Sequence, residues 1–392
     1  MHASIHLISP QIKRAPAYIY RTYVPWFISS QPKKLTMSQP KPALVLLLLA
    51  ASLCACTAAS KPLLTKINKN AASTALYTAP LLAGRALVLD LTAPAVTSPC
   101  SSGTTTTVTL SASSTDGANP LSPVSFAAKA TCAAAPSGAA GVAGLGRSSA
   151  SLPAQVASTQ KVANSFALCL PSDGKIGFSG NGVGAAIFGG GPFYLAKPAD
   201  RPAITTLLSD PVPLHHPFSG NAGYFVTATA GIAVGGATAA AGPLVVGLST
   251  TIPYTQLRSD VYRAVITAFD RAQGQSAKVS AVSPFELCYD SSKLGSSLSG
   301  YFVPQVDVML EGGTNFTVVG GNSMAQVNSN TACFAFLQMK ASGSTGPAVV
   351  IGGFQMENKL VVLDNAKQQL SFTGYVPAMG FSCSNFNFTS AA

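Results

Sequence analysis

The sequence is poor in charged residues, histidine and tryptophan, and each shortage argues against a class of function. Only 9% of the 392 residues are charged, and the chain has four histidines and one tryptophan. Because histidine is scarce and no Cys-x-x-Cys pair occurs, the sequence predicts no metal site and no cofactor. No basic helix or interleaving of aromatic and basic residues appears, which argues against nucleic-acid binding. The formal net charge of +11 is misleading, because residues 1–60 hold six basic residues and no acidic one.

The N-terminal region has the pattern of a secretory signal. Lys41 precedes an apolar run that starts at Ala43, and small residues suited to cleavage follow at 58–60. The apolar run is too short to favour a membrane span. We expect translation to start at Met37, residues 1–36 to be an upstream extension, and the mature protein to be secreted without a membrane anchor.

Secretion permits disulfide bonds. Cys54 and Cys56 would leave with the signal, so six cysteines remain as disulfide candidates: Cys100, Cys132, Cys169, Cys288, Cys333 and Cys383. Six cysteines allow 15 pairings. The sequence favours one of these pairs, Cys288 with Cys333, because both lie in the second half.

From residue 61 onward, short apolar runs are cut by glycine, proline, serine and asparagine, which predicts a β-rich protein with many turns. The clearest helix is predicted over 253–273, with Ser259 or Asp260 as its N-cap, and a short one over 150–158. The low-complexity tracts at 104–107 and 231–242 suggest solvent-exposed loops or sequence under little constraint. A proline-rich stretch, 197–220, links the halves, and its His215 and His216 are expected to be solvated.

The two halves repeat one pattern. Each has an apolar run that enters a polar turn, "LVLDLTAP" at 87–94 and "VVGLSTTIPYT" at 245–255, and each later has apolar residues followed by glycine, in "GVAGLGRSS" and "AVVIGGFQM". A bilobal aspartic protease has this repeat: in each lobe one strand delivers the catalytic turn, and a second strand ending in glycine packs beneath it.

Several stretches together resemble the plant xylanase inhibitors of the aspartic-protease fold and their relatives, the basic globulins and extracellular dermal glycoproteins. They include "ALYTAPLLAGRALVLDLTAP", "GVAGLGRSSASLPAQVAS", "FELCYDSSKLGSSLSGYFVPQVDVML" and "VIGGFQMENKLVVLDNAKQQLSF", within roughly 61–375. The resemblance implies an all-β, bilobal pepsin-like fold with a central cleft and few short helices. The N-terminal lobe is expected over 61–205 and the C-terminal lobe over 206–392. The first lobe is shortened after its turn, and the flap region of the family is largely missing.

The catalytic positions are altered. Aspartic proteolysis needs two facing carboxylates that share one proton. Asp90 supplies one, but Ser249 stands where the second belongs, and a serine hydroxyl does not ionise near neutral pH. We therefore expect no proteolysis and no catalytic residue, with Asp90 hydrogen-bonded across the lobe junction to Ser249 or Thr250.

The resemblance implies a monomer that inhibits microbial glycoside hydrolases, chiefly endoxylanases, in the cell wall by occluding their substrate cleft. The family leucine that fills a sugar subsite corresponds to Leu298 or, alternatively, Leu294; a leucine packed on its own lobe fits the pattern equally well. Ala378 and Met379 fall where the family has a histidine. Asn315 and Asn387 begin N-glycosylation sequons. The alternative function is a noncatalytic storage or binding protein, or a degenerate copy without inhibitory activity.

Overall fold

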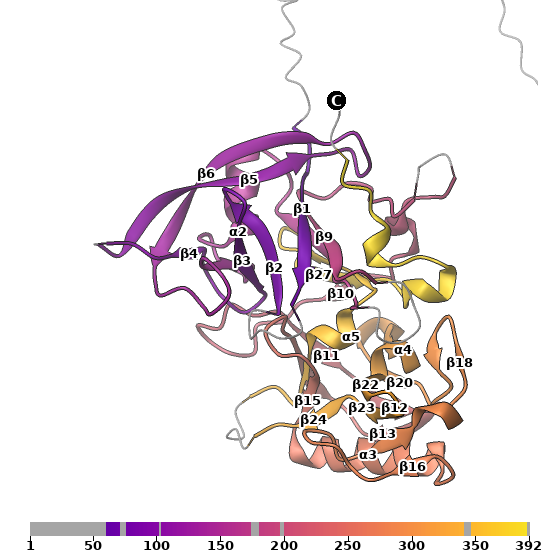
Figure 1. The fold of residues 1–392 in the computed structure, drawn as a ribbon. Coiled ribbons are helices and arrows are strands. Elements are labelled where there is room, and N and C mark those ends of the chain that lie inside the picture. The colour runs from indigo at the N-terminus through magenta and orange to yellow at the C-terminus, as the bar shows by residue number, and fades with distance from the viewer. Residues whose placement is uncertain are drawn as a thin grey trace, which may run out of the picture. The chain divides into compact units, whose positions relative to one another are not determined.

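The computed structural model describes residues 60–70, 76–101, 103–173, 180–196, 200–340 and 346–389. The predicted signal segment, Met37 and the upstream extension lie outside these residues. The described part belongs to one compact unit that begins at Ala58. Its strands far outnumber its helices, as the frequent short apolar runs predict (Figure 1).

The largest element is a twelve-stranded sheet that contains all the strands of the first half of the chain. In order across the sheet, the strands are β10 (Val212–Pro213), β27 (Gln369–Phe372), β26 (Leu360–Asp364), β8 (Ser165–Cys169), β9 (Val183–Phe188), β1 (Leu63–Lys69), β2 (Tyr77–Leu82), β3 (Arg85–Asp90), β7 (Val142–Gly144), β4 (Thr97–Ser98), β6 (Ser122–Cys132) and β5 (Thr105–Ser114). Three of them come from beyond residue 205, because β26 pairs with β8 and continues the sheet through β27 to β10. The sheet therefore crosses the predicted lobe boundary.

The second half forms four smaller sheets. The five-stranded sheet has the order β11 (Phe225–Ala228), β14 (Leu244–Leu248), β25 (Val349–Ile351), β15 (Thr255–Leu257), β24 (Phe336–Gln338). The two four-stranded sheets have the orders β13 (Ala237–Ala240), β12 (Gly231–Val234), β20 (Val306–Met309), β21 (Asn315–Val318) and β16 (Lys278–Val279), β17 (Cys288–Asp290), β23 (Thr331–Phe334), β22 (Met324–Asn328). A hairpin of β18 (Ser296–Ser297) and β19 (Gly300–Tyr301) completes the set.

Helices are few and short. The α-helices of the described residues are α2 (Leu152–Gln160), α3 (Ser259–Gln273), α4 (Gly320–Ser323) and α5 (Gly353–Met356). The 3-10 turns are η2 (Ile204–Leu207), η3 (Ser291–Lys293), η4 (Glu311–Gly313), η5 (Val376–Met379) and η6 (Cys383–Asn385).

The long helix differs from its prediction at the N-terminus. α3 begins at Ser259 because 255–257 form strand β15. The predicted N-cap is wrong: Arg258 occupies that position without a side-chain cap, and its guanidinium instead binds the Asp260 carboxylate at 2.7 and 2.9 Å. The apolar face of α3 buries Val261, Val265 and Phe269, as its spacing requires.

The threonine tract, expected to be a loop, is part of the longest hairpin. β5 and β6 pair over ten residues and form the ribbon at the top of Figure 1. β-branched threonine suits an extended strand, and alternate threonines of β5 face solvent. The second tract, 231–242, likewise contains strands β12 and β13. In β5 side-chain branching and alternating burial favour the strand, although the composition is simple. β12 is buried along its whole length, where it pairs with β13 and β20.

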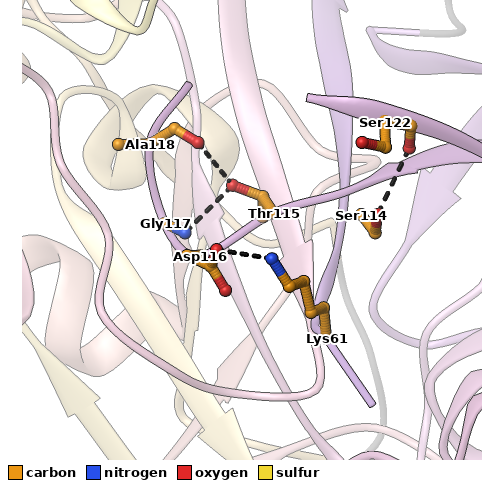
Figure 2. A network of polar contacts seen from close by, with 7 residues as sticks. All are labelled: Lys61, Ser114, Thr115, Asp116, Gly117, Ala118 and Ser122. Atoms are coloured by element: carbon orange, nitrogen blue, oxygen red, sulfur yellow. Dashed lines mark hydrogen bonds and ion pairs between the residues drawn. The ribbon is translucent and has the colours of Figure 1, made fainter. Parts of the chain in front are cut away.

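Local hydrogen bonds order the turn between β5 and β6, as Figure 2 shows. The Thr115 hydroxyl donates to the Ala118 carbonyl and accepts from the Gly117 amide, both at 2.9 Å. The Lys61 ammonium pairs with the Asp116 carboxylate at 2.7 Å. The Tyr194 amide donates to the Gly117 carbonyl of this turn at 2.9 Å, which holds the turn against the segment that follows β9.

Three disulfides join the six candidate cysteines. Cys288 pairs with Cys333 across neighbouring strands, which is the pair that the sequence favours. The other pairs are Cys100 with Cys132 and Cys169 with Cys383. The last bond spans 214 residues and ties the C-terminal turn η6 to strand β8 of the large sheet.

Candidate functional site

The two polar turns are built in the same way. β3 ends at Asp90 and runs parallel to β7, where Asp90 is opposite Gly144. β14 ends immediately before Ser249 and runs parallel to β25, which leads to Gly352. A Cβ atom on Gly144 would lie 2.2 Å from the Ala95 carbonyl oxygen, and one on Gly352 would lie 2.5 Å from the backbone of Tyr254. Glycine is therefore required beneath each turn, and the internal repeat seen in the sequence is structural.

One threonine links the two turns. The Thr250 hydroxyl donates to the Leu89 carbonyl at 2.6 Å and accepts from the Leu91 amide at 3.3 Å. Both contacts are buried. Leu91 occupies the corresponding position of the first turn, and its apolar side chain has no hydroxyl with which to return these bonds. The side-chain hydrogen bonds between the two turns therefore come from Thr250 of the second turn and not from Leu91 of the first.

The Asp90 carboxylate does not make the predicted bond across the junction. Its Oδ1 accepts from the amide and the hydroxyl of Thr92, at 2.8 and 2.7 Å. Ser249 likewise bonds within its own turn, with its Oγ 3.1 Å from Thr251 Oγ1. A side-chain hydrogen bond to a residue two positions ahead forms within the turn itself, so these side chains need no partner across the junction. The junction therefore depends on Thr250, while Asp90 and Ser249 each stabilise a local turn.

The hairpin of β18 and β19 separates the two alternative leucines. Leu294 is only 3% exposed and belongs to the core, so it is not available to a partner. Leu298 lies in the hairpin turn and is 50% exposed. Phe302, which follows β19, is 64% exposed. The sequence does not predict this exposure, because a single apolar residue in a β-rich chain is usually expected to be buried.

The C-terminal turn and this hairpin both border helix α4. The Ser299 carbonyl in the hairpin accepts from the Gly321 amide at 2.7 Å. On the other side, a Cβ atom on Gly321 would lie 2.5 Å from the Tyr375 hydroxyl. Ala378 and Met379, which follow Tyr375 in η5, are exposed, and Met379 is 37% exposed. Two separate segments that carry exposed apolar side chains therefore contact the same short helix.

A cluster of ionisable side chains, not anticipated from the sequence, lies where strands of the large sheet meet the second half of the chain. The Lys69 ammonium lies 2.8 Å from Glu357 Oε1 and 3.7 Å from Asp173 Oδ2. The Tyr77 hydroxyl donates to Glu357 Oε1 at 2.5 Å. Glu357 and Tyr77 are 280 residues apart, so no local spacing in the sequence indicates the contact.

Burial dominates the electrostatics of this cluster. It raises the pKa of Glu357 to about 7, although the Lys69 ammonium and the hydrogen bonds from Lys69 and Tyr77 act in the opposite direction. Burial also lowers the pKa of Lys69, but Glu357 and Asp173 more than offset this, so that its pKa is raised. The Lys69 side chain is therefore a cation wedged between two carboxyl groups.

These groups line a cavity of about 180 Å³, called the junction pocket below. Its floor is buried, and its rim contains half-buried aromatic side chains. The lining residues are Lys69, Leu76, Tyr77, Asp173, Pro253, Tyr254, Ala325, Gln326, Phe354 and Glu357.

The histidines of the linking stretch are at least partly exposed, as expected of a solvated loop, and each also has a partner. His215 Nε2 lies 2.8 Å from Glu311 Oε2, and His216 Nε2 lies 2.6 Å from a terminal nitrogen of Arg147. Asn315 begins β21 and is exposed, and Asn387 is also exposed, so both sequon asparagines lie at the surface.

Within the described ranges, no group of three or more metal-ligating side chains comes together. No helix of the described residues is long and apolar enough to cross a membrane.

Comparison with known proteins places these features in a family. The family model described as "Xylanase inhibitor N-terminal" matches residues 88–190, and the one described as "Xylanase inhibitor C-terminal" matches 224–374, together more than half of the chain. A curated relative from Oryza sativa subsp. japonica, "Chitinase CLP", is 44% identical over 88% of this chain and 99% of its own length. "Gamma conglutin 1" of Prunus dulcis is 31% identical over 64% of this chain and 57% of its own length.

Solved structures show the same fold. "Crystal structure of edgp" matches with a TM-score of 0.73 and 24% identity over 84% of this chain and 99% of that one. "Crystal structure of aspartic proteinase from Irpex lacteus" matches with a TM-score of 0.57 and 11% identity over 82% of this chain and 99% of that one. The predicted all-β pepsin-like fold is confirmed. The chain belongs to the xylanase-inhibitor family of aspartic-protease-like proteins.

Proposed function

We propose that this chain is a secreted, proteolytically inactive protein that binds and inhibits microbial glycoside hydrolases of the endoxylanase type by occluding their substrate cleft. The observation that carries the proposal is the exposure of three large apolar side chains, Leu298, Phe302 and Met379. These three side chains, called the hairpin surface below, come from the β18–β19 hairpin with the residue after it and from η5. The family match supports a glycoside hydrolase as the partner.

The junction of the two turns supports the absence of proteolysis. Asp90 and Ser249 begin equivalent turns after strands with the same parallel pairing, so one position carries a carboxylate and the other a hydroxyl. One carboxylate cannot serve as acid and base together in the shared-proton mechanism. We therefore assign no catalytic role to either residue.

The chemistry of the hairpin surface suits an enzyme cleft that binds sugars. Large apolar side chains that fill a partner's pockets contribute most of the energy of many interfaces. In the family, a histidine of the C-terminal turn faces the two carboxylates of the enzyme, and here Ala378 and Met379 occupy that place. Without this ring, the surface relies on apolar contact, and we expect weaker inhibition than the family pattern implies.

Inhibition assays test the proposal. The purified chain is titrated against a panel of endoxylanases and chitinases, and the inhibition constant and its competition with substrate are measured. Leu298→Asp and Phe302→Asp are expected to raise the inhibition constant at least about thirtyfold. Leu207→Asp is the matched control, because Leu207 is an exposed leucine (41%) in η2, away from the hairpin. Met379→His is expected to lower the constant. Inhibition that is unchanged in both hairpin variants would contradict the proposed surface.

The similarity to a protein named a chitinase supports a second candidate, glycan hydrolysis by the chain itself. This candidate predicts release of reducing sugar from colloidal chitin by the purified chain alone, with no added enzyme. The absence of both hydrolysis and inhibition would favour a storage or binding protein.

A further inference from the structure

The junction pocket is lined by groups that recognise a particular class of ligand. Its floor consists of Lys69, Tyr77 and Glu357, and its rim carries Tyr254 and Phe354. Six short segments contribute to it: two before Asp90, the segment that ends in Asp173, and three after Ser249. Neither Asp90 nor Ser249 is among its lining residues. Neither the two turns nor the hairpin surface uses its floor.

Charge and size exclude several ligands. The Lys69 ammonium sits between Glu357 and Asp173, and its positive charge disfavours a second cation there. A phosphate or other anion would face both of these carboxyl groups, which disfavours it. A cavity of about 180 Å³ is also smaller than the roughly 300–1,000 Å³ of pockets for drug-sized ligands. The remaining fit is a small, uncharged and strongly hydrogen-bonding molecule.

The rim provides an aromatic surface in a fixed orientation. The Tyr254 ring makes T-shaped contacts with Phe285, at 4.8 Å between ring centroids, and with Phe354, at 5.6 Å. Its hydroxyl makes no hydrogen bond to any residue that the structure describes. The Asp173 carboxylate, whose side chain is 30% exposed and pairs with Lys69, lines the same space. A pyranose ring matches this arrangement, because it has an apolar C–H face and a rim of hydroxyl groups.

We propose that the junction pocket binds a single sugar residue, such as the end of a plant or fungal wall polysaccharide. The C–H face of the sugar packs on Tyr254, and its hydroxyl groups bond to the Tyr254 hydroxyl and the Asp173 carboxylate. The site binds and does not cleave, because Glu357 is 2% exposed and already bonded to Lys69 and Tyr77.

The pocket also shares a wall with the hairpin surface. Gln326 lines the pocket, and its Oε1 accepts from the Tyr301 hydroxyl at 2.5 Å, while its Nε2 donates to Ser291 Oγ at 3.1 Å. Ser291 and Tyr301 lie at the two ends of the segment that carries Leu298. A sugar held in the pocket therefore lies beside the base of the hairpin.

Saturation-transfer NMR of the full chain tests the site with three separate probes: xylotriose, triacetylchitotriose and inorganic phosphate. We expect saturable binding of at least one of the two sugars in the millimolar range or tighter, and the arm that binds identifies xylan or chitin as the source. Tyr254→Leu is expected to weaken binding at least about tenfold. Asp173→Asn, which keeps the side-chain shape, is expected to weaken it several-fold. Leu207→Asp should bind like the parent.

The proposal is overturned if neither sugar binds saturably, if phosphate binds and the sugars do not, or if Tyr254→Leu and Asp173→Asn both bind like the parent. Thermal melting checks that each variant is folded. If Tyr254→Leu does not fold, Asp173→Asn alone decides, because its isosteric change at a partly exposed position preserves packing. Sugar binding is measured without an enzyme, so failure here and failure of the inhibition assays are separate results.

Discussion

Replacing Glu357 with glutamine is expected to remove a large pH dependence from the stability of the fold. Burial raises the pKa of Glu357 from its ordinary value of 4.5 to about 7, so the folded state favours the protonated form. This contribution to the free energy of unfolding is fully present below pH 4.5 and is lost as the pH rises through 7. Between pH 5 and pH 8 it amounts to roughly 2–3 kcal/mol.

The experiment compares urea unfolding of the parent and Glu357→Gln at pH 5 and pH 8. Glutamine keeps the side-chain shape and an acceptor for the Tyr77 hydroxyl, but it does not titrate. The parent should lose roughly 2–3 kcal/mol more than the variant over this interval. Glu286→Gln is the matched control, because Glu286 is partly exposed and pairs with Arg263 at the surface. Equal pH dependence in the parent and Glu357→Gln would refute the argument that burial controls this carboxyl group.

Three further predictions concern the interior. Burial lowers the pKa of Lys359 to about 7. Lys359→Met should therefore raise the unfolding free energy by up to about 4 kcal/mol near pH 6 and change it little near pH 10. An equal effect at both pH values in denaturant unfolding would contradict this. Thr250→Val should lower the unfolding free energy by about 1–2 kcal/mol, because the buried Leu89 carbonyl loses its donor. An unchanged melting temperature would argue against the link between the turns. Loss of the Cys169–Cys383 bond in the double alanine variant should lower the unfolding free energy by roughly 5 kcal/mol in the chain-entropy model. A smaller decrease than in the Cys288–Cys333 double alanine variant would contradict this.

The sequence predicts the features that depend on local pattern. The apolar run before each polar turn and the glycine beneath it repeat in both halves, and the structure reproduces this repeat around Asp90 and Ser249. The buried face of α3 follows from its periodicity. These features need only neighbouring residues, so a single sequence contains the information for them.

Features that depend on distant contacts could not be predicted. The pairing of β26 with β8 joins segments nearly two hundred residues apart, and the pattern of neither strand indicates its partner. The contact of Tyr77 with Glu357 also joins segments that are distant in the sequence, and so do the residues that line the junction pocket. Exposure is similarly hidden, because Leu294 and Leu298 are the same residue type four positions apart and only one is buried.

The scaffold holds its turns and its hairpin in fixed positions, and this is what a binding surface requires. The glycines beneath the turns, the Thr250 link and the Cys169–Cys383 bond hold the structure without using the chemistry of Asp90. The hairpin surface is fixed in turn, because Ser299 bonds to α4 and Tyr301 bonds to Gln326. Ordering a mobile loop at an interface opposes binding, whereas a hairpin already held in place avoids most of that cost. Exposed Leu298 and Phe302 on such a support are therefore better suited to entering a partner's cleft than to packing on their own chain.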